Sequence, residues 1–576
     1  MMNRLTLQQL YLPKAEGISI DKELYVRGDY QVVGKAIIAK KTLSFNTYFN
    51  SFSIYKWRLY TGCENVTVIV DVEGCAEVTV VNSYIANGKI TEVVVATKNI
   101  SGPGTITIPP SDYEGILYLT VSGNQEYTVK KINYEADVPN YRDIKLSIGI
   151  CTFRREDYVY NNIKHLNDNI INRQNSCLYD KLEVFISDNG HTLEKNKLGG
   201  EKIHLYPNRN YGGAGGFTRT IIESQIKNAH PSDYIILMDD DIVLDYQVLE
   251  RTWRLLSSLK PDYYCSMIGG ALLAKEEPHL QVENGCYFSP DGVYLKVNNN
   301  YDLRNFQKVV ENEIISDANY NGWYYCCIPA SVINEENLPL PIFIHYDDGD
   351  YGTRNPHHQI QMMGISVWHP NTVGKDPLWM NYYNSRNLLI LQSRGDRLTR
   401  KFVLKQLMIY YLSVVSYDYK TARLGMQGIH DYYKGPVLLK NTDPLDYHLK
   451  LSKNNKYAPE PLPERIQWSS KKCSLKEFYI KGLLRMFIPS FGDIAYVERY
   501  GEKRNVFSCK RIGVVDDRNK NVCYYDKSII ENLKISVIFL FITICVVLTH
   551  DIQVKKWHQA YKDFTKLSFW NKYLGL

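Results

Sequence analysis

The chain has 576 residues, of which 44% are hydrophobic and 23% charged, and its formal net charge is +6. This length leaves room for three or four domains, and the composition is ordinary for a globular protein. Residues 401–576 contain 29 Lys and Arg against 16 Asp and Glu, a net charge of +13, so the first 400 residues carry −7. A basic end on an acidic body favours anionic lipid or polyphosphate as a partner and argues against general nucleic-acid binding.

The cysteines and the start of the chain predict a cellular compartment. The twelve Cys form no C-x-x-C pair, and several lie in apolar runs, as small hydrophobic residues do in a reducing environment. The first residues, MMNRLTLQQLYLPK, lack the apolar core of a signal peptide. We therefore expect a cytoplasmic protein.

Residues 1–140 are predicted to form an antiparallel β-sandwich. Segments such as ENVTVIVDVEG and GILYLTVSG are rich in β-branched and aromatic residues and are separated by Gly, Asn and Pro. Short strands at close, regular spacing are typical of a sandwich. Such a domain would bind carbohydrate or only brace its neighbour, and the sequence favours bracing.

Residues 141–395 change to alternating strands and helices. LSIGICTF, LEVFISDNG, KIHLYPN and YIILMDDD read as strands, and helical spacing follows the first and third. This alternation predicts a mostly parallel sheet, in which ligands bind at the carboxyl ends of the strands. Polar residues that would meet at that edge are Thr152, Arg154, Asp188, Asn189 and Asp239 to Asp241.

Three consecutive carboxylates, Asp239, Asp240 and Asp241, follow the apolar run Tyr234 to Met238. Adjacent acids repel one another, so a fold keeps them at a buried strand end only if a positive group compensates. Mn²⁺ or Mg²⁺ bridging a nucleotide diphosphate would do so, because these ions prefer carboxylate and phosphate oxygens. Asp239 and Asp241 would point to the same side, in the D-x-D spacing of nucleotide-sugar transferases. A solvated acidic turn is the alternative.

Two further strand ends carry polar groups that suit a nucleotide. Thr152 and Arg154, in CTFRRED, would hold its base and phosphate through hydroxyl and guanidinium contacts. Asp188, in SDNG, would accept a hydrogen bond from a uracil N–H or a ribose hydroxyl. The glycines of NRNYGGAGGFTR would let the backbone approach a phosphate, or would serve a tight turn and close helix packing.

A second acidic cluster, Asp347, Asp348 and Asp350, follows what reads as another short apolar strand in PIFIHYDDGDYGTR. Sugar transfer with inversion needs a carboxylate that takes the proton from the incoming hydroxyl. We assign this role to Asp348 and expect Asp347 to orient or bind the acceptor. His369, in SVWHP, is expected to complete the metal site, because imidazole joins carboxylates around Mn²⁺.

Residues 396–576 read as a basic helical region. Ile535 to Thr549 is an apolar run of about 15 residues, short of the roughly 20 needed to span a bilayer. Three interpretations stay open for it: a buried core helix, a helix docked on a membrane surface, and a true span. Docking is favoured, because basic amphipathic segments surround the run.

The ordered motifs CTFRRED, SDNG, NYGGAGGF, MDDDI, NGWYYCCIP, FIHYDDGDYGTR and VWHP resemble those of the galactofuranosyltransferases that polymerise mycobacterial galactan. These are family-2 glycosyltransferases with a GT-A catalytic domain. The resemblance covers residues 145–390, with looser support for a β-sandwich before it and helices after it. It implies UDP-galactofuranose as donor and an inverting, metal-dependent transfer.

Residue roles follow from the resemblance. It implies that the uridine is held by Arg154, Asp188 and Asn210, and that the metal is held by Asp239, Asp241 and His369, with Asp240 beside the nucleotide. Asp348 is the implied base, next to Asp347, and Trp323 and Tyr324 the implied aromatic wall for a sugar. The family's paired tryptophans appear here as Trp-Tyr, and Tyr346 replaces a Trp before the acidic pair, so acceptor identity and linkage are the open points.

The expected protein is therefore a multidomain α/β enzyme of bacterial surface polysaccharide synthesis, peripheral at the inner face of the cell membrane, acting on a lipid-linked saccharide acceptor. Self-association is left open. One alternative keeps the chemistry and changes the donor, for example to dTDP-rhamnose. Another is a non-catalytic glycan-binding protein, which gives no account of two acidic clusters and a histidine at strand ends. Hydride transfer is disfavoured by the spacing of the glycines.

Overall fold

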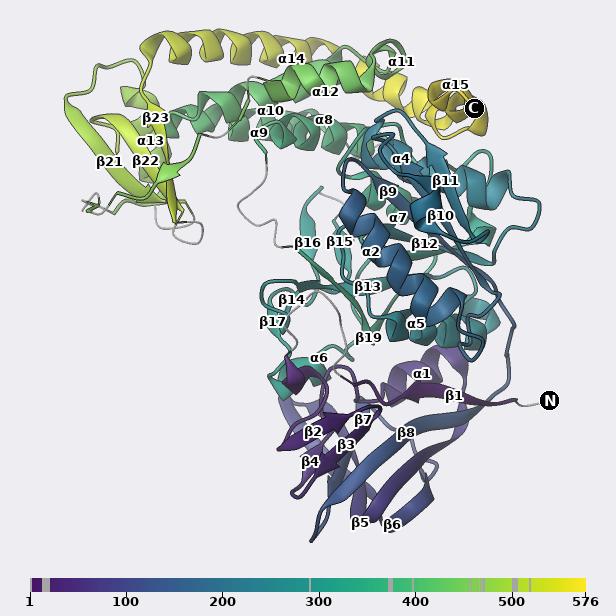
Figure 1. The fold of residues 1–576 in the computed structure, drawn as a ribbon. Coiled ribbons are helices and arrows are strands. Elements are labelled where there is room, and N and C mark those ends of the chain that lie inside the picture. Colours follow the sequence, from purple (N-terminus) through teal and green to yellow (C-terminus); the bar gives the residue numbers. More distant parts are fainter. Residues whose placement is uncertain are drawn as a thin grey trace.

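The computed structural model describes residues 3–12, 21–289, 292–370, 377–395, 398–453, 455–456, 458–463, 465–466, 468, 472–499, 506–516 and 520–576. The chain folds into three regions in sequence order, stacked along one direction (Figure 1). A β-rich region lies at one end, an α/β region in the middle, and a region dominated by long helices at the other end.

The N-terminal region is an antiparallel sheet of eight strands. Hydrogen bonds join all eight into one sheet, and the predicted sandwich stays a prediction. The long strand β5 makes the sheet continuous, because its first half pairs with β8 and its second half pairs with β7. The other edge of β5 pairs with β6, and a bulge interrupts this pairing between Val72 and Ala76. The strands are β1 (Asn3–Gln9), β2 (Tyr30–Val33), β3 (Ala36–Ala39), β4 (Leu43–Ser44), β5 (Glu64–Ala86), β6 (Lys89–Thr107), β7 (Ile116–Ser122) and β8 (Tyr127–Val138).

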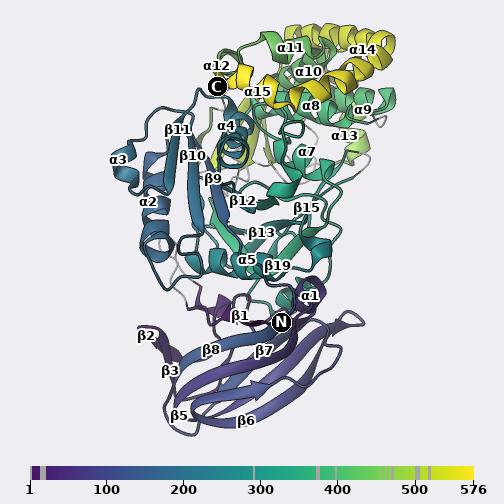
Figure 2. The ribbon, with the colours of Figure 1, turned by 90° about the vertical axis from the view of Figure 1, so that its right-hand side faces the viewer.

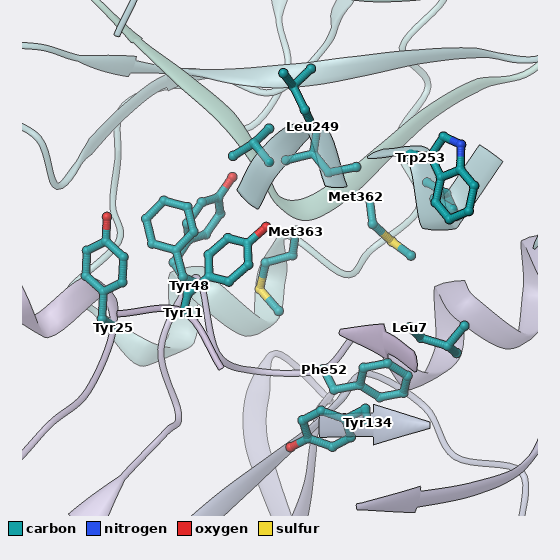
Figure 3. Packing of buried hydrophobic residues seen from close by; sticks show 14 of the residues in the cluster. Leu7, Tyr11, Tyr25, Tyr48, Phe52, Tyr134, Leu249, Trp253, Met362 and Met363 are labelled. Carbon is teal, nitrogen blue, oxygen red and sulfur yellow. The ribbon is translucent and has the colours of Figure 1, made fainter. Parts of the chain in front are cut away.

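A continuous hydrophobic core joins this region to the next one. In Figure 3, tyrosines of the N-terminal region, including Tyr11 and Tyr48, lie beside Met363 of the central sheet and below Leu249. The buried Arg251 guanidinium lies over the Tyr11 ring, 4.2 Å from its centroid, and donates a 2.8 Å hydrogen bond to the carbonyl of Phe49. Shared apolar burial of this kind holds the two regions together.

The central sheet has β9 at its topological switch point (Figure 2). β10 and β11 lie on one side of β9 and β12 on the other, all parallel. Beyond β12, β18 runs antiparallel to both β12 and β13, and β14 runs antiparallel to β13. β13 and β19 run in the direction of β12, so the sheet is mostly parallel, as predicted. The strands are β9 (Leu146–Thr152), β10 (Leu182–Asp188), β11 (Ile203–Pro207), β12 (Tyr234–Asp239), β13 (Met267–Ala274), β14 (Leu280–Glu283), β17 (Tyr301–Asp302), β18 (Tyr325–Pro329) and β19 (Gln359–His369), with a separate hairpin of β15 (Cys286–Phe288) and β16 (Tyr294–Lys296).

Helices of the first two regions cover the sheets and connect them (Figures 1 and 2). Two of them begin at a capping residue, Asp245 before α5 and Asn305 before α6. They are α1 (Ile54–Thr61), α2 (Glu156–Leu166), α3 (Lys195–Leu198), α4 (Gly212–Ile221), α5 (Tyr246–Ser258), α6 (Phe306–Glu311) and α7 (Asp347–Arg354).

The C-terminal region contains helices and a four-stranded sheet, so the purely helical prediction is wrong. The segments CKRIGVVD and NVCYYD alternate β-branched and aromatic residues with polar ones, which favours strands and was overlooked beside the long helical runs. The strands are β20 (Glu460–Pro461), β21 (Gly492–Glu498), β22 (Cys509–Asp516) and β23 (Asn521–Asp526). The helices are α8 (Met380–Gln392), α9 (Arg400–Tyr411), α10 (Tyr419–Tyr433), α11 (Val437–Asn441), α12 (Pro444–Lys453), α13 (Leu475–Arg485), α14 (Ile529–Phe564) and α15 (Leu567–Leu574).

The apolar run Ile535 to Thr549 lies inside α14, a helix of 36 residues. Among the described residues, α14 is the one helix long and apolar enough to cross a membrane, by length and composition alone. Only 22% of its most apolar stretch is buried in the protein. A core helix of a soluble protein is mostly buried, so this interpretation of the run fits poorly.

Candidate active site

The acidic triplet lies at the carboxyl end of β12, next to β9 at the switch point. Beyond it, Val243 and Trp368 form a two-residue bridge, with both backbone N–H groups donating to the opposite carbonyl at 2.7 and 3.2 Å. This bridge joins the segment after the triplet to the end of β19. It therefore holds His369 beside the triplet.

His369 and two of the three acids form a compact group of potential metal ligands. The Nε2 atom of His369 lies 3.1 Å from an Asp241 oxygen and 3.9 Å from an Asp239 oxygen. One ligand atom from each of the three residues lies within 4.8 Å of the others. The other ring nitrogen, Nδ1, is 2.7 Å from the carbonyl of Pro370, which directs Nε2 toward the acids.

The charges of this group suit a divalent cation. Withdrawal from solvent raises the pKa of Asp239 to about 7, although 38% of its side chain stays exposed. Burial opposes a charged His369, but its hydrogen bond to Asp241 and the Asp239 charge outweigh this and raise its pKa to about 9. Oxygen Oδ1 of Asp241 is buried and faces the His369 ring at 3.1 Å. A divalent cation coordinated by these side chains would offset the free-energy cost of burying their charges. The three residues therefore fit a divalent metal ion.

The middle acid, Asp240, points elsewhere and is held by other residues. Thr152 donates to one of its oxygens at 2.7 Å, and Arg155 Nη1 lies 3.0 Å from the other. The same Arg155 atom lies 2.5 Å from Asp241. Asn162 of α2 donates to the backbone carbonyl of Asp240 at 2.9 Å. Asp240 therefore anchors the loop after β12.

Arg155, and not its neighbour Arg154, contacts the acidic triplet. Both belong to the motif CTFRRED, but the motif alone does not say which guanidinium turns inward. Arg154 is exposed, has a left-handed backbone (φ 56°) and lies over the ring of Phe153. The Arg154 side chain is therefore exposed to solvent at the carboxyl end of β9.

Asp188 ends β10, in register with Thr152 of β9, as expected for the nucleotide side of the site. Its carboxylate is already used by the following turn, accepting from the backbone N–H groups of Gly190, Thr192 and Leu193 at 3.0, 2.7 and 2.8 Å. The main contacts of Asp188 are therefore within this buried turn. A ligand could use only the lone pairs of its carboxylate that the turn leaves unoccupied.

Asn210 caps the glycine segment, because its side-chain oxygen accepts from the N–H of Gly212 at 2.9 Å. The glycines themselves form the first turn of α4. A Cβ on Gly212 would lie 2.0 Å from the carbonyl of Phe343, and one on Gly216 would lie 2.2 Å from the sulfur of Cys151. These glycines are therefore needed for close packing of α4 against β9 and the loop before α7.

The second acidic cluster opens a helix, not a loop after a strand. Asp347 and Asp348 are the first residues of α7, and the segment before them is irregular, so the strand predicted there is wrong. Three residues in that segment, Phe343, His345 and Tyr346, have left-handed backbones (φ 75°, 71° and 69°). Such conformations are costly for bulky side chains and persist where the surroundings impose them.

Asn387 of α8 imposes this conformation. It is fully buried, and its amide nitrogen lies 3.2, 2.7 and 3.0 Å from the carbonyls of Ile342, Ile344 and His345. Sequence analysis missed Asn387, since a lone Asn in a helix carries no signal of a contact some 43 residues away. It is a positioning residue for the acids at the start of α7.

The acid pair at the start of α7 is withdrawn from solvent, which favours the protonated forms. Burial raises the pKa of Asp347 to about 6. Burial, followed by the charges of Asp347, Glu283 and Asp239, raises the pKa of Asp348 well above its usual value. Because Asp239 contributes to this shift, Asp348 is electrostatically coupled to the metal-ligand group. A carboxyl with a raised pKa is suited to accept a proton near neutral pH.

Trp323 and Tyr324 precede β18, whose first residue pairs with Met238 of β12. Trp323 is only 5% exposed and packs edge-on against Phe217 and Tyr351. Tyr324 is 9% exposed. Both rings belong mainly to the wall beneath the site, and only a small edge of either is accessible to a sugar.

Comparison with known proteins agrees with this geometry. A family model described as galactofuranosyltransferase 2 N-terminal matches residues 5–137, and one described as glycosyl transferase family 2 matches residues 147–302. The galactofuranosyltransferase GlfT2 of Mycolicibacterium smegmatis is 26% identical over 430 residues, covering 68% of this chain and 64% of that protein. GlfT2 of Mycobacterium tuberculosis is 25% identical over 427 residues, covering 69% and 66%. The chain is thus similar to family-2 galactofuranosyltransferases along its N-terminal and central regions.

The family match spans slightly less than two thirds of each of these relatives' own length. The two matching models correspond to the N-terminal sheet and to the part of the central sheet that carries the acidic triplet. Together with β9 at the switch point, the second match supports a GT-A fold for the central region. Mannosyl-3-phosphoglycerate synthase from Rubrobacter xylanophilus is structurally similar only at a TM-score of 0.27, with 13% identity over 44% of this chain and 76% of that one, too remote to bear on function.

Proposed function

We propose that this protein transfers galactofuranose from UDP-galactofuranose to a hydroxyl group of a glycan acceptor, with inversion and with a divalent metal. The single observation that carries the proposal is the meeting of Asp239, Asp241 and His369 at a strand edge that also couples to the buried acid pair at the start of α7. A turn or a glycan-binding surface has no need of that arrangement.

Asp239, Asp241 and His369 would hold Mn²⁺ or Mg²⁺, with carboxylate and imidazole ligands that both ions accept. When bound, the cation supplies charge neutralisation for the diphosphate leaving group. Thr152 and Arg155 hold Asp240 away from this group. Arg155 also pairs with Oδ2 of Asp241, and Oδ1 of Asp241, which faces His369, would be its metal ligand.

Asp348 is the proposed base. It would take the proton from the acceptor hydroxyl as that oxygen bonds to the anomeric carbon and UDP departs from the opposite face. Asp347 raises the proton affinity of Asp348 and orients the acceptor. The uridine would lie along the ends of β9 and β10, where the exposed Arg154 and the loop of Asp188 and Asn210 are available.

The first test is transfer by the purified full chain, given UDP-galactofuranose, Mn²⁺ and a galactofuranosyl disaccharide. We expect release of UDP and extension of the acceptor by galactofuranose, seen by mass spectrometry. In parallel, dTDP-rhamnose and UDP-galactopyranose report donor choice. Extension only with another donor would overturn the sugar assignment, and no UDP release with several acceptors would overturn the enzyme assignment.

We also propose that α14 docks on the inner surface of the cell membrane and so brings the site to a lipid-linked acceptor. One face of α14 packs on α9 and α10, where His550 is buried between the Tyr433 hydroxyl and the Leu398 carbonyl at 3.0 Å each. The opposite face exposes a row of apolar side chains, namely Ile530, Leu533, Val537, Leu540, Phe541, Ile544, Val547, Leu548 and Ile552. A helix that packs on protein along one face and exposes apolar side chains along the other suits docking at a membrane surface better than crossing the bilayer.

Neighbouring segments extend this apolar face. After α13, Phe487 and Phe491 are exposed, Phe491 by 83%. The surrounding region carries a net positive charge, which attracts anionic lipid.

Sedimentation with vesicles containing phosphatidylglycerol tests the docking. We expect Leu540→Glu together with Phe541→Glu to abolish co-sedimentation while transfer to a soluble acceptor continues. Val94→Glu is the matched control, since Val94 is also exposed, by 64%, but lies in the N-terminal sheet. Binding that survives the double substitution would contradict docking through α14.

A further inference from the structure

A large cavity lies apart from the candidate active site, where α1, the β15–β16 hairpin, α7, β19 and α8 approach one another. Its volume is about 530 Å³, within the range of roughly 300–1,000 Å³ that small-molecule sites occupy. None of the residues assigned to metal, nucleotide or proton transfer lines it. It is therefore a separate space and not an extension of the metal site.

Helix α7 connects the cavity to the active site. Asp347 and Asp348 are at the first turn of α7, whereas Thr353 and Asn355, at its end, line the cavity. At a rise of about 1.5 Å per residue, the eight residues of α7 span about 12 Å. A single small ligand does not reach both places, but an oligomer does.

The lining mixes polar and apolar side chains and is almost uncharged. It contains amides and hydroxyls, two histidines and one guanidinium, that of Arg394, and no carboxylate among the described residues. Arg394 is already engaged, since its Nη atoms donate to the carbonyls of Asp350 and Thr353 at 3.1 Å each. A polyanion would call for more free cations. Amides, hydroxyls and the rings of Tyr60 and Phe288 suit a neutral, polyhydroxylated ligand.

Two buried polar side chains of the cavity have no hydrogen-bond partner in the part of the chain that the structure describes. Tyr60 is 6% exposed and Gln392 is 7% exposed, and both line the cavity. Within the described residues, neither the Tyr60 hydroxyl nor the Gln392 amide makes a hydrogen bond, yet neither is sealed from solvent. Buried polar groups are costly unless something satisfies them, so these two groups are available to a ligand or to water in the cavity.

We propose that this cavity binds a neutral oligosaccharide segment of the growing glycan, at a distance from the end that is being extended. The class of ligand follows from the cavity, and the choice of a galactofuranosyl chain rests on the proposed function. Such a site would hold a long acceptor more tightly than a short one. A disaccharide, which ends before the cavity, gains nothing from it.

Photo-crosslinking tests the site without requiring transfer. The probe is a galactofuranosyl hexasaccharide with a diazirine at its reducing end, mixed with the full-length wild-type chain, and the crosslinked peptides are identified by mass spectrometry. We expect labels within residues 353–359 or 391–395. Labels confined to the loop of the acidic triplet and the start of α7, or no labels at all, would overturn the proposal. Maltohexaose carrying the same group reports whether any neutral glycan suffices.

Substitutions supply the second arm. Tyr60→Phe and Gln392→Leu should each lower the crosslinking yield at least about fivefold and raise KM for the hexasaccharide by a similar factor, with KM for the disaccharide unchanged. Tyr55→Phe is the matched control, because Tyr55 is exposed on the same helix and does not line the cavity. Equal effects on both acceptors would contradict the proposal. If no acceptor is extended at all, the proposed function is wrong. The crosslinks to the wild-type chain still show whether the cavity binds the oligosaccharide.

Discussion

Tyr561, near the end of α14, donates a hydrogen bond to the carboxylate of Asp350 in α7. Asp350 is completely buried and also pairs with Arg354 at 3.1 Å and Arg394 at 3.7 Å. The third acid of the second cluster is thus structural, and it links the helix that carries the proposed base to the helix proposed to touch the membrane.

Removing the Tyr561 hydroxyl should loosen this link. Tyr561→Phe leaves an Asp350 oxygen with fewer partners, and we expect a loss of unfolding free energy of about 1–3 kcal/mol. Denaturant unfolding followed by circular dichroism measures it. Tyr573→Phe is the control, since no hydrogen bond joins the Tyr573 hydroxyl to the described residues. Equal stability of both variants would mean that the contact contributes nothing.

Replacing the proposed base should separate binding from chemistry. We expect Asp348→Asn to lower kcat by about 10²- to 10⁴-fold, the usual contribution of a general base. Calorimetric affinity for UDP in the presence of Mn²⁺ should stay within about twofold of the wild type, since Asp348 is not a proposed ligand. A loss of UDP affinity as large as the loss of rate would place Asp348 in the binding site instead.

The acid pair should also set the pH dependence of transfer. A raised pKa means that the base, Asp348, is protonated, and inactive, until the pH rises past its pKa. We therefore expect kcat/KM to fall as the pH is lowered through apparent pKa values that belong to the pair and lie above the usual range of a carboxyl group.

Asp347→Asn should move this acidic limb to lower pH. After burial, the Asp347 charge is the next largest cause of the raised pKa of Asp348, and the substitution removes it. Asp245→Asn is the control, because burial raises the pKa of Asp245 to about 6 as well, but this residue caps α5 outside the site. A limb that stays in place or moves upward in Asp347→Asn would contradict the assignment.

Asn387 should matter for activity although it touches no substrate. Asn387→Leu removes the donor to three loop carbonyls and frees a segment with three left-handed residues. We expect a kcat loss of at least about tenfold and a stability loss of roughly 2–4 kcal/mol. Asn381→Leu is the control, because Asn381 lies on the same helix and, within the described residues, its side chain bonds only to the nearby Leu378 carbonyl. Normal kcat in a destabilised Asn387→Leu would show that the loop needs no such hold.

Much of the site could be predicted from local sequence. An apolar run that ends in acids identifies a strand end, and parallel strands bring such ends to one edge, which is why Asp239, Asp241 and His369 were expected to meet. The second acidic cluster was expected near them, and the Asp239 charge acts on Asp348, but the cluster opens a helix and does not end a strand. The apolar segment PIFIHY is typical of a strand. In the structure, the buried amide of Asn387 holds this segment, in which Phe343, His345 and Tyr346 have left-handed conformations.

Contacts between distant segments set the remaining features. The sequence gives no reason to choose between Arg154 and Arg155, because both are arginines of the same motif. The backbone turn after β9 directs the Arg155 side chain, and not that of Arg154, to the acidic triplet. The role of Asp350 depends on Tyr561, 211 residues away. The four-stranded sheet of the C-terminal region was missed because its short alternating segments lie between long helical runs, where helix spacing dominates the pattern.

The most direct test of the account is to locate the metal. Crystals of the full chain grown with UDP and MnCl₂ would be measured at a wavelength where manganese scatters anomalously. We predict an anomalous peak bonded to Asp239, Asp241 and His369 and to the diphosphate of UDP. UDP bound at the ends of β9 and β10 without manganese on these three side chains, or manganese bound elsewhere, would contradict it.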